Sequence, residues 1–261
     1  MAPRPPGYPE ISLSLFCPAY YDEKNVDKVV EGALAAVEEM GLRDYEIIIV
    51  EDGSPDRTAE VADALAARHE RVRVIHHGVN KGYGTALKTG FEAARYEYVF
   101  YTDGDNQFNL DELKRLVALC PYADIVAGFR VYKQYTFYRK LTSRIYYLVL
   151  KYLFDLPDRD INCAFKLYPT RLFREFTIES KAGFIDAEIA LQARMRGYRT
   201  LEVGVSHLPR KDGVALGASS SMVVKTIREM LRFHGKHGNR IRTLRRRGRW
   251  REAPGAPEEI E

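Results

Sequence analysis

Apolar and polar residues divide the first half of the chain into two alternating kinds of segment. One kind is short and rich in apolar residues, which predicts strands over residues 11–18, 45–52, 71–77 and 96–103, and the strand over 45–52 is apolar on both faces and therefore buried. The other kind repeats apolar residues every three to four positions, which predicts helices over residues 25–41, 54–70, 83–95 and 110–120. This alternation predicts an α/β fold with a mostly parallel central sheet and helices on both faces.

The predicted helix over residues 54–70 has the clearest start signal. Ser54 is a favoured capping residue, and Pro55 would occupy the first helical position, where a missing N–H costs nothing. Gly41 is a stop signal for the helix before it. We therefore expect the helix over residues 54–70 to begin directly after Ser54.

Three of the predicted strands are followed by loops that carry carboxylates, at residues 18–23, 51–56 and 102–108. In open α/β sheets, ligands bind beyond the carboxyl ends of the strands. We therefore expect these three loops to lie together around a ligand site.

The third of these loops contains DGDNQF, in which Asp103, Asp105 and Gln107 are each two residues apart. Alternate residues of extended backbone face the same side, so the two aspartate Cα atoms would lie about 6.6 Å apart. Their carboxylates, with Gln107 as a third oxygen ligand, would hold one hard cation. Mg²⁺ or Mn²⁺ typically binds one or two protein carboxylates together with substrate phosphates. The alternative is a solvated acidic turn, followed by a helix cap at Asn109.

The glycine-rich loops that bind phosphate in other α/β proteins are missing. The chain contains no GxxxxGK[ST] sequence, and GYGTALKTG (82–90) follows the third predicted strand rather than the first. If the ligand carries a diphosphate, a metal ion would therefore be its main clamp.

Composition and charge suggest one large domain with a basic tail. The 261 residues are 46% hydrophobic, and the net charge is +4. Without residues 232–261, the chain has 31 basic against 32 acidic side chains, so the body shows no nucleic-acid footprint. We expect a disordered N-terminus over residues 1–10, a catalytic domain over 11–231 and a basic tail over 232–261.

The three cysteines are far apart and form no CxxC motif, so they indicate neither a zinc site nor a disulfide framework. A reducing cytosol is the simplest compartment for such a chain. The N-terminal sequence lacks the apolar core of a signal peptide, and no apolar run reaches the length of a transmembrane helix.

Several motifs together resemble the family 2 glycosyltransferases of GT-A fold. In order along the chain they are PAYYDEKNV (18–26), VEDGSPDRT (50–58), NKGYGTALKTG (80–90) and DGDNQF (103–108). The later part is most similar to the dolichol- and polyprenyl-phosphate hexosyltransferases, through GFR (128–130), YRKLTSR (138–144), DINCAFKLYP (160–169), FIDAEIALQARMRGY (184–198) and HLPRKDG (207–213). The first motif departs from the family pattern, because Tyr21 replaces Asn and Asp22 replaces Glu.

The resemblance implies a nucleotide-diphosphate sugar as donor and a metal ion, Mg²⁺ or Mn²⁺, as cofactor. Asp103 would touch the ribose and the donor sugar and contribute to the metal site, Asp105 would bind the metal directly, and Gln107 would complete the metal shell. The nucleotide-sugar site would also include Pro18, Tyr20, Asp22, Asp52, Lys81, Arg210 and Lys211, with Asp52 on the base edge and Arg210 on the diphosphate.

The same resemblance implies a lipid phosphate as acceptor, held by Arg130, Arg139 and Ser143. Transfer would be direct and inverting, with Asp186 as an orienting group. If the acceptor is instead a hydroxyl of a glycan or glycolipid, Asp186 is the candidate general base. The alternative interpretation of Asp186 is a helix cap, and the alternative for Arg130 and Arg139 is that they are ordinary basic residues of the surface.

The region 131–156 interleaves aromatic and basic residues, and the tail adds further positive charge. Both features favour contact with an anionic membrane, at the inner face of the cytoplasmic membrane. A core-packed helix and a solvated tail are the alternatives. A nucleotidyltransferase and a non-enzymatic interaction module remain as less favoured functions.

Overall fold

The computed structural model describes residues 8–132, 137–210 and 220–246. Its sheet has the strand order β3-β2-β1-β4-β6-β5-β7, and β6 runs antiparallel to both of its neighbours. The strands are β1 (Leu13–Ala19), β2 (Tyr45–Glu51), β3 (Val72–His76), β4 (Tyr98–Thr102), β5 (Ile125–Arg130), β6 (Phe165–Pro169) and β7 (Thr200–Val205).

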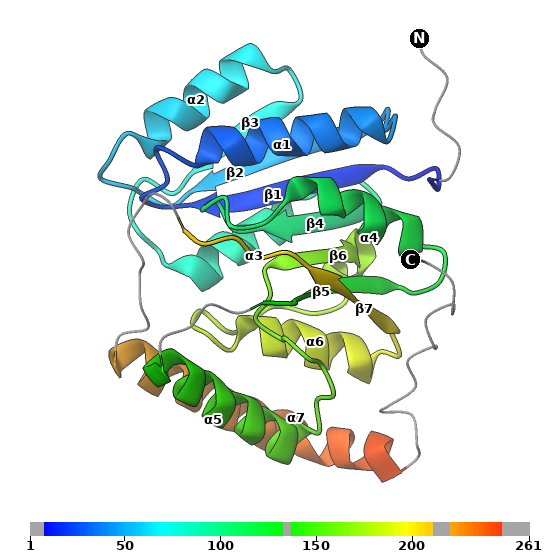
Figure 1. Cartoon of the computed structure of the whole chain (residues 1–261). Coiled ribbons are helices and arrows are strands. Elements are labelled where there is room, and N and C mark those ends of the chain that lie inside the picture. The colour runs from blue at the N-terminus through cyan, green and yellow to red at the C-terminus, as the bar shows by residue number, and fades with distance from the viewer. Residues whose placement is uncertain (1–7, 133–136, 211–219, 247–261) are drawn as a thin grey trace.

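Helices cover both faces of this sheet (Figure 1). They are α1 (Val26–Glu39), α2 (Thr58–Arg68), α3 (Tyr83–Ala93), α4 (Leu113–Leu119), α5 (Phe137–Phe154), α6 (Ile185–Met195) and α7 (Ser220–Arg246), with short 3-10 segments η1 (Leu110–Glu112) and η2 (Thr170–Arg174). The predicted α/β fold with a mostly parallel sheet is confirmed.

The start predicted for the second helix is wrong. Helix α2 begins at Thr58, because Ser54 and Thr58 both donate hydroxyl hydrogen bonds to Asp56, over 2.5 and 2.6 Å. Ser54 also accepts the backbone N–H of Tyr21 over 2.9 Å. The predicted helix start is therefore a turn that holds the loop after β2 against the loop after β1.

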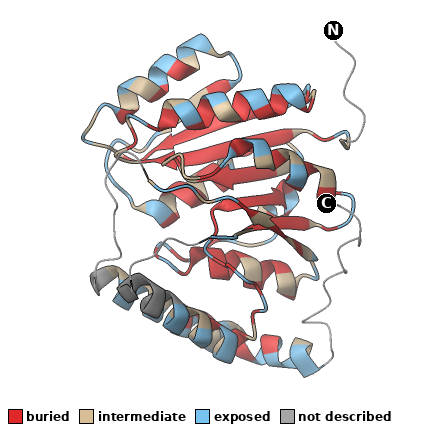
Figure 2. Ribbon diagram, in the orientation of Figure 1, coloured by how far each residue is buried: buried red, intermediate tan, exposed pale blue. Residues whose placement is uncertain are grey.

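The core has two parts. The larger one lies around the sheet, and the smaller one joins α6 to α5 and α7 (Figure 2). Helix α6 serves both, since Ile185 and Ile189 contact the sheet core while Ala187 and Leu191 belong to the second cluster. The aromatic-rich helix α5 therefore packs beyond α6, in an outer layer with α7 (Figure 1).

The domain boundary predicted after residue 231 falls inside α7. Phe233 and Ile241 are buried in the second cluster, so the helix continues unbroken through the expected boundary. The basic residues 232–246 thus belong to the folded body, whereas 247–261 and most of the predicted N-terminal segment lie outside the described residues. In the part of the chain that the structure describes, no helix is both long and apolar enough to cross a membrane.

Candidate active site

The loop after β4 packs tightly on the end of β1, and Gly104 makes this possible. A Cβ atom at Gly104 would lie 2.5 Å from the carbonyl oxygen of Pro18 and 3.1 Å from a carboxylate oxygen of Asp22. Because no other residue fits there without displacement, the glycine brings Asp103 and Asp105 up to the carboxyl end of β1. The expected meeting of the loops is therefore found in the structure.

Asp22 lies at the base of this meeting point and is buried. Its carboxylate accepts the backbone N–H of Tyr20 over 3.1 Å, and its own N–H donates to the Thr58 hydroxyl over 2.9 Å. Burial raises the pKa of Asp22 to about 6, and the nearby Asp105 carboxylate adds to the rise. The fold thus buries a carboxyl group whose ionised form would be better solvated in water.

Asp103 is half-buried and accepts a hydrogen bond from the Tyr83 hydroxyl over 3.0 Å. Loss of solvation raises the pKa of Asp103 to about 7, and the negative charges of Asp105 and Asp186 act in the same direction. Repulsion between neighbouring carboxylates is relieved when a cation binds between them.

Asp105 forms an ion pair with Arg210. Arg210 reaches it because the segment before it pairs with the loop after β4: Leu208 donates its N–H to the Gln107 carbonyl over 2.7 Å, and the Gln107 side chain donates to the Leu208 carbonyl over 2.8 Å. Arg210 is thus held against the loop after β4, and its predicted contact with a diphosphate remains a prediction. The Gln107 amide nitrogen is engaged by this pairing, and its role as a metal ligand remains a prediction.

The donor set fits a hard divalent cation such as Mg²⁺ or Mn²⁺. Asp103 and Asp105 supply carboxylate oxygens, and their crowding with Asp22 gives the site the negative charge that such an ion neutralises. Among the described residues, no group of three or more His, Cys, Asp or Glu side chains is arranged as a complete metal site. Two carboxylates would therefore have to be joined by oxygens of the substrate.

Several of the predicted nucleotide residues lie on or next to the loops after β1 and β2. Pro18 is the last but one residue of β1 and is buried, and Tyr20 is half-exposed. Asp52 is buried and accepts the backbone N–H groups of Lys81 and Gly82 over 2.9 and 2.8 Å. Its carboxylate therefore shapes the loop that carries Lys81, while its predicted contact with the base is untested.

Asp186 is close enough for its negative charge to raise the pKa of Asp103, and its side chain is held by residues of β4 and β6. Its Oδ1 accepts hydrogen bonds from the buried Lys166 ammonium over 2.8 Å and from the Tyr101 hydroxyl. Loss of solvation lowers the pKa of Lys166, but the Asp186 charge is the largest of several opposing contributions that together leave that pKa raised. Asp186 is thus fixed by a buried ion pair rather than serving only as a helix cap.

The predicted acceptor residues are only partly described. Arg130 makes a forked ion pair with Asp160, with Nε and Nη2 at 2.7 and 2.8 Å from the two carboxylate oxygens, and it lies close enough to Asp103 to lower that pKa. The backbone of α5 contains Arg139 and Ser143, but their side chains lie outside the described residues, as does Lys211.

Sequence reasoning missed several partners of these residues. Tyr83, Lys166 and Asp160 are brought to Asp103, Asp186 and Arg130 only by the tertiary fold. Lys166 had a signal, because it interrupts the apolar segment CAFKLYP and a lysine in a buried strand requires an acidic partner. The other two gave no such signal.

Comparison with known proteins identifies the family. A family model described as glycosyl transferase family 2 matches residues 14–180. The chain is a family 2 glycosyltransferase. The resemblance seen in the motifs is confirmed, and the fold is the GT-A fold.

Two curated relatives show which glycosyltransferases this chain is similar to in sequence. Glycosyltransferase AglD of Haloferax volcanii is 30% identical over 212 residues, which cover 77% of this chain and 34% of that protein. The undecaprenyl-phosphate 4-deoxy-4-formamido-L-arabinose transferase of Pectobacterium carotovorum is 28% identical over 208 residues, covering 78% of this chain and 62% of the relative. The chain therefore spans less than two thirds of the length of these relatives.

Solved structures with the same fold include glucosyl-3-phosphoglycerate synthase from Mycobacterium tuberculosis, crystallised with Mn²⁺, uridine diphosphate and phosphoglyceric acid. Its TM-score is 0.66 at 17% identity, over 84% of this chain and 78% of that one. Mannosyl-3-phosphoglycerate synthase from Rubrobacter xylanophilus has a TM-score of 0.60 at 19% identity, over 95% of this chain and 79% of that one. At this identity, the likeness concerns the fold.

Proposed function

We propose that this glycosyltransferase moves a hexose from a nucleotide-diphosphate sugar to a polyprenyl phosphate, with inversion and with Mg²⁺ or Mn²⁺ as cofactor. The observation that carries the proposal is the convergence of Asp22, Asp103 and Asp105 opposite Arg210, at the carboxyl ends of β1 and β4. The relative named as an undecaprenyl-phosphate sugar transferase supports the choice of acceptor.

The charges of the site suit departure of a nucleoside diphosphate. Breaking the bond between the sugar and phosphate leaves extra negative charge on the leaving group, and a bound divalent cation would act on it as a Lewis acid. Asp103 and Asp105 would hold that cation. Arg210 would then exchange its contact with Asp105 for a forked contact with the diphosphate.

A phosphate nucleophile makes a modest demand on Asp186. The second pKa of a phosphate monoester is near 6, so the acceptor is mostly dianionic at neutral pH and needs little help in losing a proton. The anchoring of Asp186 Oδ1 by Lys166 and Tyr101 supports an orienting role. A hydroxyl acceptor is the second candidate, because no described residue donates a hydrogen bond to Asp186 Oδ2, which leaves that oxygen for a general base.

The outer layer formed by α5 and α7 supports a peripheral position on a membrane. We call its exposed side the α5/α7 outer face. Large apolar residues stand there at helical spacing, with exposed fractions of 45–85%: Ile145, Leu148, Tyr152, Val223, Val224, Ile227 and Leu231. Exposed basic residues accompany them: Arg144, Lys151, Lys225, Arg228 and Arg232. An apolar strip flanked by positive charge favours an anionic bilayer surface, which we place on the cytoplasmic leaflet.

Both helices begin on the side of the molecule to which the carboxyl ends of β1 and β4 point (Figure 1). If the protein lies with its α5/α7 outer face on a bilayer, the candidate active site would therefore be close to the bilayer surface. This arrangement suits an acceptor whose phosphate stands at the bilayer surface.

The donor is tested by thermal unfolding with UDP-, GDP- and dTDP-hexoses, each with Mg²⁺, with Mn²⁺ and with EDTA. One donor should raise the melting temperature only when the metal is present, because binding to the folded state stabilises it. A shift that is equal with metal and with EDTA would contradict the proposed role of the cation.

The acceptor is tested with that donor by transfer of radiolabelled sugar to undecaprenyl phosphate or to undecaprenol. We expect product with the phosphate and none with the alcohol. Product with the alcohol, or with a glycan alone, would favour the hydroxyl acceptor instead.

A further inference from the structure

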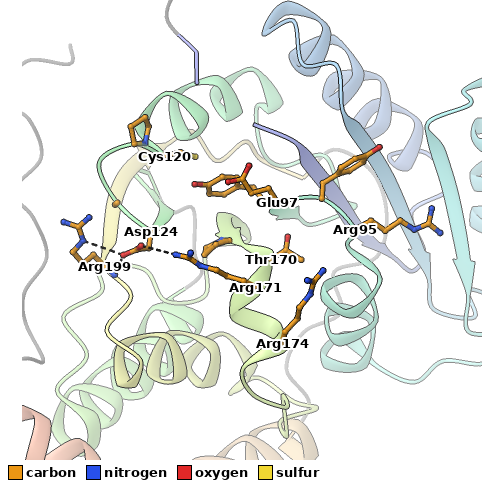
Figure 3. Close-up of a pocket in the computed structure, with 13 residues that line it drawn as sticks. Arg95, Glu97, Cys120, Asp124, Thr170, Arg171, Arg174 and Arg199 are labelled. Carbon is orange, nitrogen blue, oxygen red and sulfur yellow. Dashed lines mark hydrogen bonds and ion pairs between the residues drawn. The ribbon is translucent and has the colours of Figure 1, made fainter. Parts of the chain in front are cut away.

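A cavity lies at the opposite ends of the central strands from the candidate active site. It has a volume of about 380 Å³ and is bordered by Tyr98 at the start of β4, Pro169 at the end of the antiparallel β6, and Arg199 just before β7 (Figure 3). Asp103 follows the other end of β4. The five-residue strand therefore separates the two sites by roughly 13 Å, at about 3.3 Å per residue.

The lining of this cavity is rich in arginine. Arg171 and Arg199 both approach Asp124, at 3.7 and 3.6 Å, and their side chains remain 69% and 52% exposed. Arg95 and Arg174 also line the cavity, and within the described residues neither guanidinium has an ion-pair partner. Four arginines against Asp124 and Glu97 leave the cavity with an excess of positive charge.

Thr170 provides an independent observation. The residue is 4% exposed and lines the cavity, yet its hydroxyl has no hydrogen-bond partner among the described residues. Buried hydroxyls are nearly always satisfied, so one without a partner beside a cavity indicates a missing ligand or water. Figure 3 shows Thr170 on η2 together with Arg171 and Arg174, on the side that faces the cavity.

We propose that this cavity, defined by Arg95, Thr170, Arg171, Arg174 and Arg199, binds a small phosphorylated molecule of about hexose-phosphate size. The planar fork of Arg174 matches phosphate oxygens, and the Thr170 hydroxyl on the same 3-10 segment would donate to the same group, while Arg95 would add positive charge at the rim. The volume suits one small ligand. Tyr96 and Tyr98 supply ring surface against which an uncharged part can pack.

This site is distinct from the donor site, since no residue lining it belongs to the loops around Asp103. Its occupant would therefore not be the sugar donor. The proposal does not depend on the acceptor proposed above.

The test is calorimetric titration of the full chain with glucose 6-phosphate, inorganic phosphate and glucose. We expect glucose 6-phosphate to bind more tightly than inorganic phosphate, and glucose not to bind. Binding should persist in Arg210→Gln, which removes the cationic group that the donor site offers to phosphate and so excludes the donor site as its location. Equal binding of inorganic phosphate and glucose 6-phosphate, or no binding of either, would overturn the assignment.

Variants then locate the site. Arg95→Gln and Arg174→Gln should each weaken glucose 6-phosphate binding about tenfold or more, whereas Arg68→Gln, an exposed arginine on α2, should not. Thr170→Val should weaken binding while leaving the melting temperature of the free protein unchanged or higher, because it removes an unsatisfied buried hydroxyl. Unchanged binding in both arginine variants would reject the site.

Discussion

At the scale of single residues, the candidate site depends on acidic side chains placed closer together than they would lie in water. Asp22 and Asp103 have pKa values of about 6 and about 7, both raised chiefly by loss of solvation. Arg210 offsets part of this charge through Asp105. The site is therefore prepared for additional positive charge, which is the property that a metal-assisted diphosphate site requires.

The first prediction concerns Asp105. Asp105→Asn should lower sugar transfer by about 100-fold or more, because it removes a proposed metal ligand and the partner of Arg210. Transfer rates with saturating metal provide the measurement. Asp111→Asn is the matched control, since this acid is 62% exposed and pairs only at the surface with Lys114. Equal rates in the two variants would contradict the role of Asp105.

The second prediction concerns pH. The folded protein retains the protons of Asp22 and Asp103 to higher pH than the unfolded chain, because both folded pKa values exceed the ordinary value of 3.8. Their contribution to stability is therefore present at low pH and is lost as pH rises from about 4 through about 7. Since a cation competes with those protons, Mn²⁺ should raise the melting temperature more at about pH 8 than at about pH 6.

Melting curves with EDTA and with Mn²⁺ across this range would check the prediction. Asp103→Asn should flatten both dependences, whereas Asp111→Asn should leave them unchanged. A shift by Mn²⁺ that does not vary with pH would be evidence against binding at these carboxylates.

The third prediction concerns the buried pair of Asp186 and Lys166. Asp186→Asn alone leaves the Lys166 ammonium buried without its counter-charge, which should cost about 3–5 kcal/mol of stability. Lys166→Met combined with Asp186→Asn should be less destabilised, as measured by urea unfolding. A double variant no more stable than the single one would contradict this account of the pair.

Among the molecules that remain folded, we expect Asp186→Asn to slow transfer to polyprenyl phosphate only modestly. A loss of about 1000-fold would indicate an essential general base and hence a hydroxyl nucleophile.

At the scale of elements, the site is made by loops that fit against one another at the ends of neighbouring strands. The strand pattern alone predicted that the loops after β1, β2 and β4 would meet, because parallel strands end at the same edge. Their close fit depends on Gly104 and on the turn of Ser54, Asp56 and Thr58. The predicted start of α2 was wrong because that turn uses the residues expected to cap the helix.

The fourth prediction tests the close fit at Gly104. Gly104→Ala places a methyl group 2.5 Å from a backbone oxygen, so it should destabilise the fold by about 1–3 kcal/mol and lower donor binding. Gly235→Ala is the control, because nothing lies near its added Cβ and alanine favours helix α7; it should stabilise by up to about 1 kcal/mol. Denaturant unfolding of both variants should therefore give opposite signs, and equal signs would contradict the packing argument.

At the scale of the whole molecule, two layers with different surfaces flank α6. The sheet carries the polar site at its carboxyl edge, and the α5/α7 outer face carries exposed apolar and basic residues. Removing the chain after residue 231 would cut through α7 and delete Phe233 and Ile241. The residues that pack against them in the second cluster would then be exposed. Surface substitutions are therefore the better way to examine membrane contact.

The fifth prediction concerns that contact. Ile227→Ser with Leu231→Ser should reduce sedimentation with vesicles of phosphatidylcholine and phosphatidylglycerol, because both side chains are about half exposed on the outer face. Tyr122→Ser is the control, since Tyr122 is 50% exposed on the loop after α4, outside the outer face. Unchanged sedimentation of the double variant would remove this face from the proposal.

The sequence by itself determined the class of fold, the order of its first elements and the region of the site. Apolar periodicity decides which segments are buried, and parallel strands bring their following loops to one edge. The DGD loop and its neighbours could therefore be predicted from local pattern. The family resemblance carried the remaining motifs, and it is confirmed.

The tertiary structure alone decided which side chains meet across long sequence separations. Lys166 and Asp186 pair from a strand and a helix, Arg130 pairs with Asp160, and Phe233 and Ile241 join α7 to the body. These contacts arise when elements pack, since the distance between two side chains then depends on sheet order and helix placement. No local pattern contains that information, which is why the cavity around Thr170 emerged only from the folded chain.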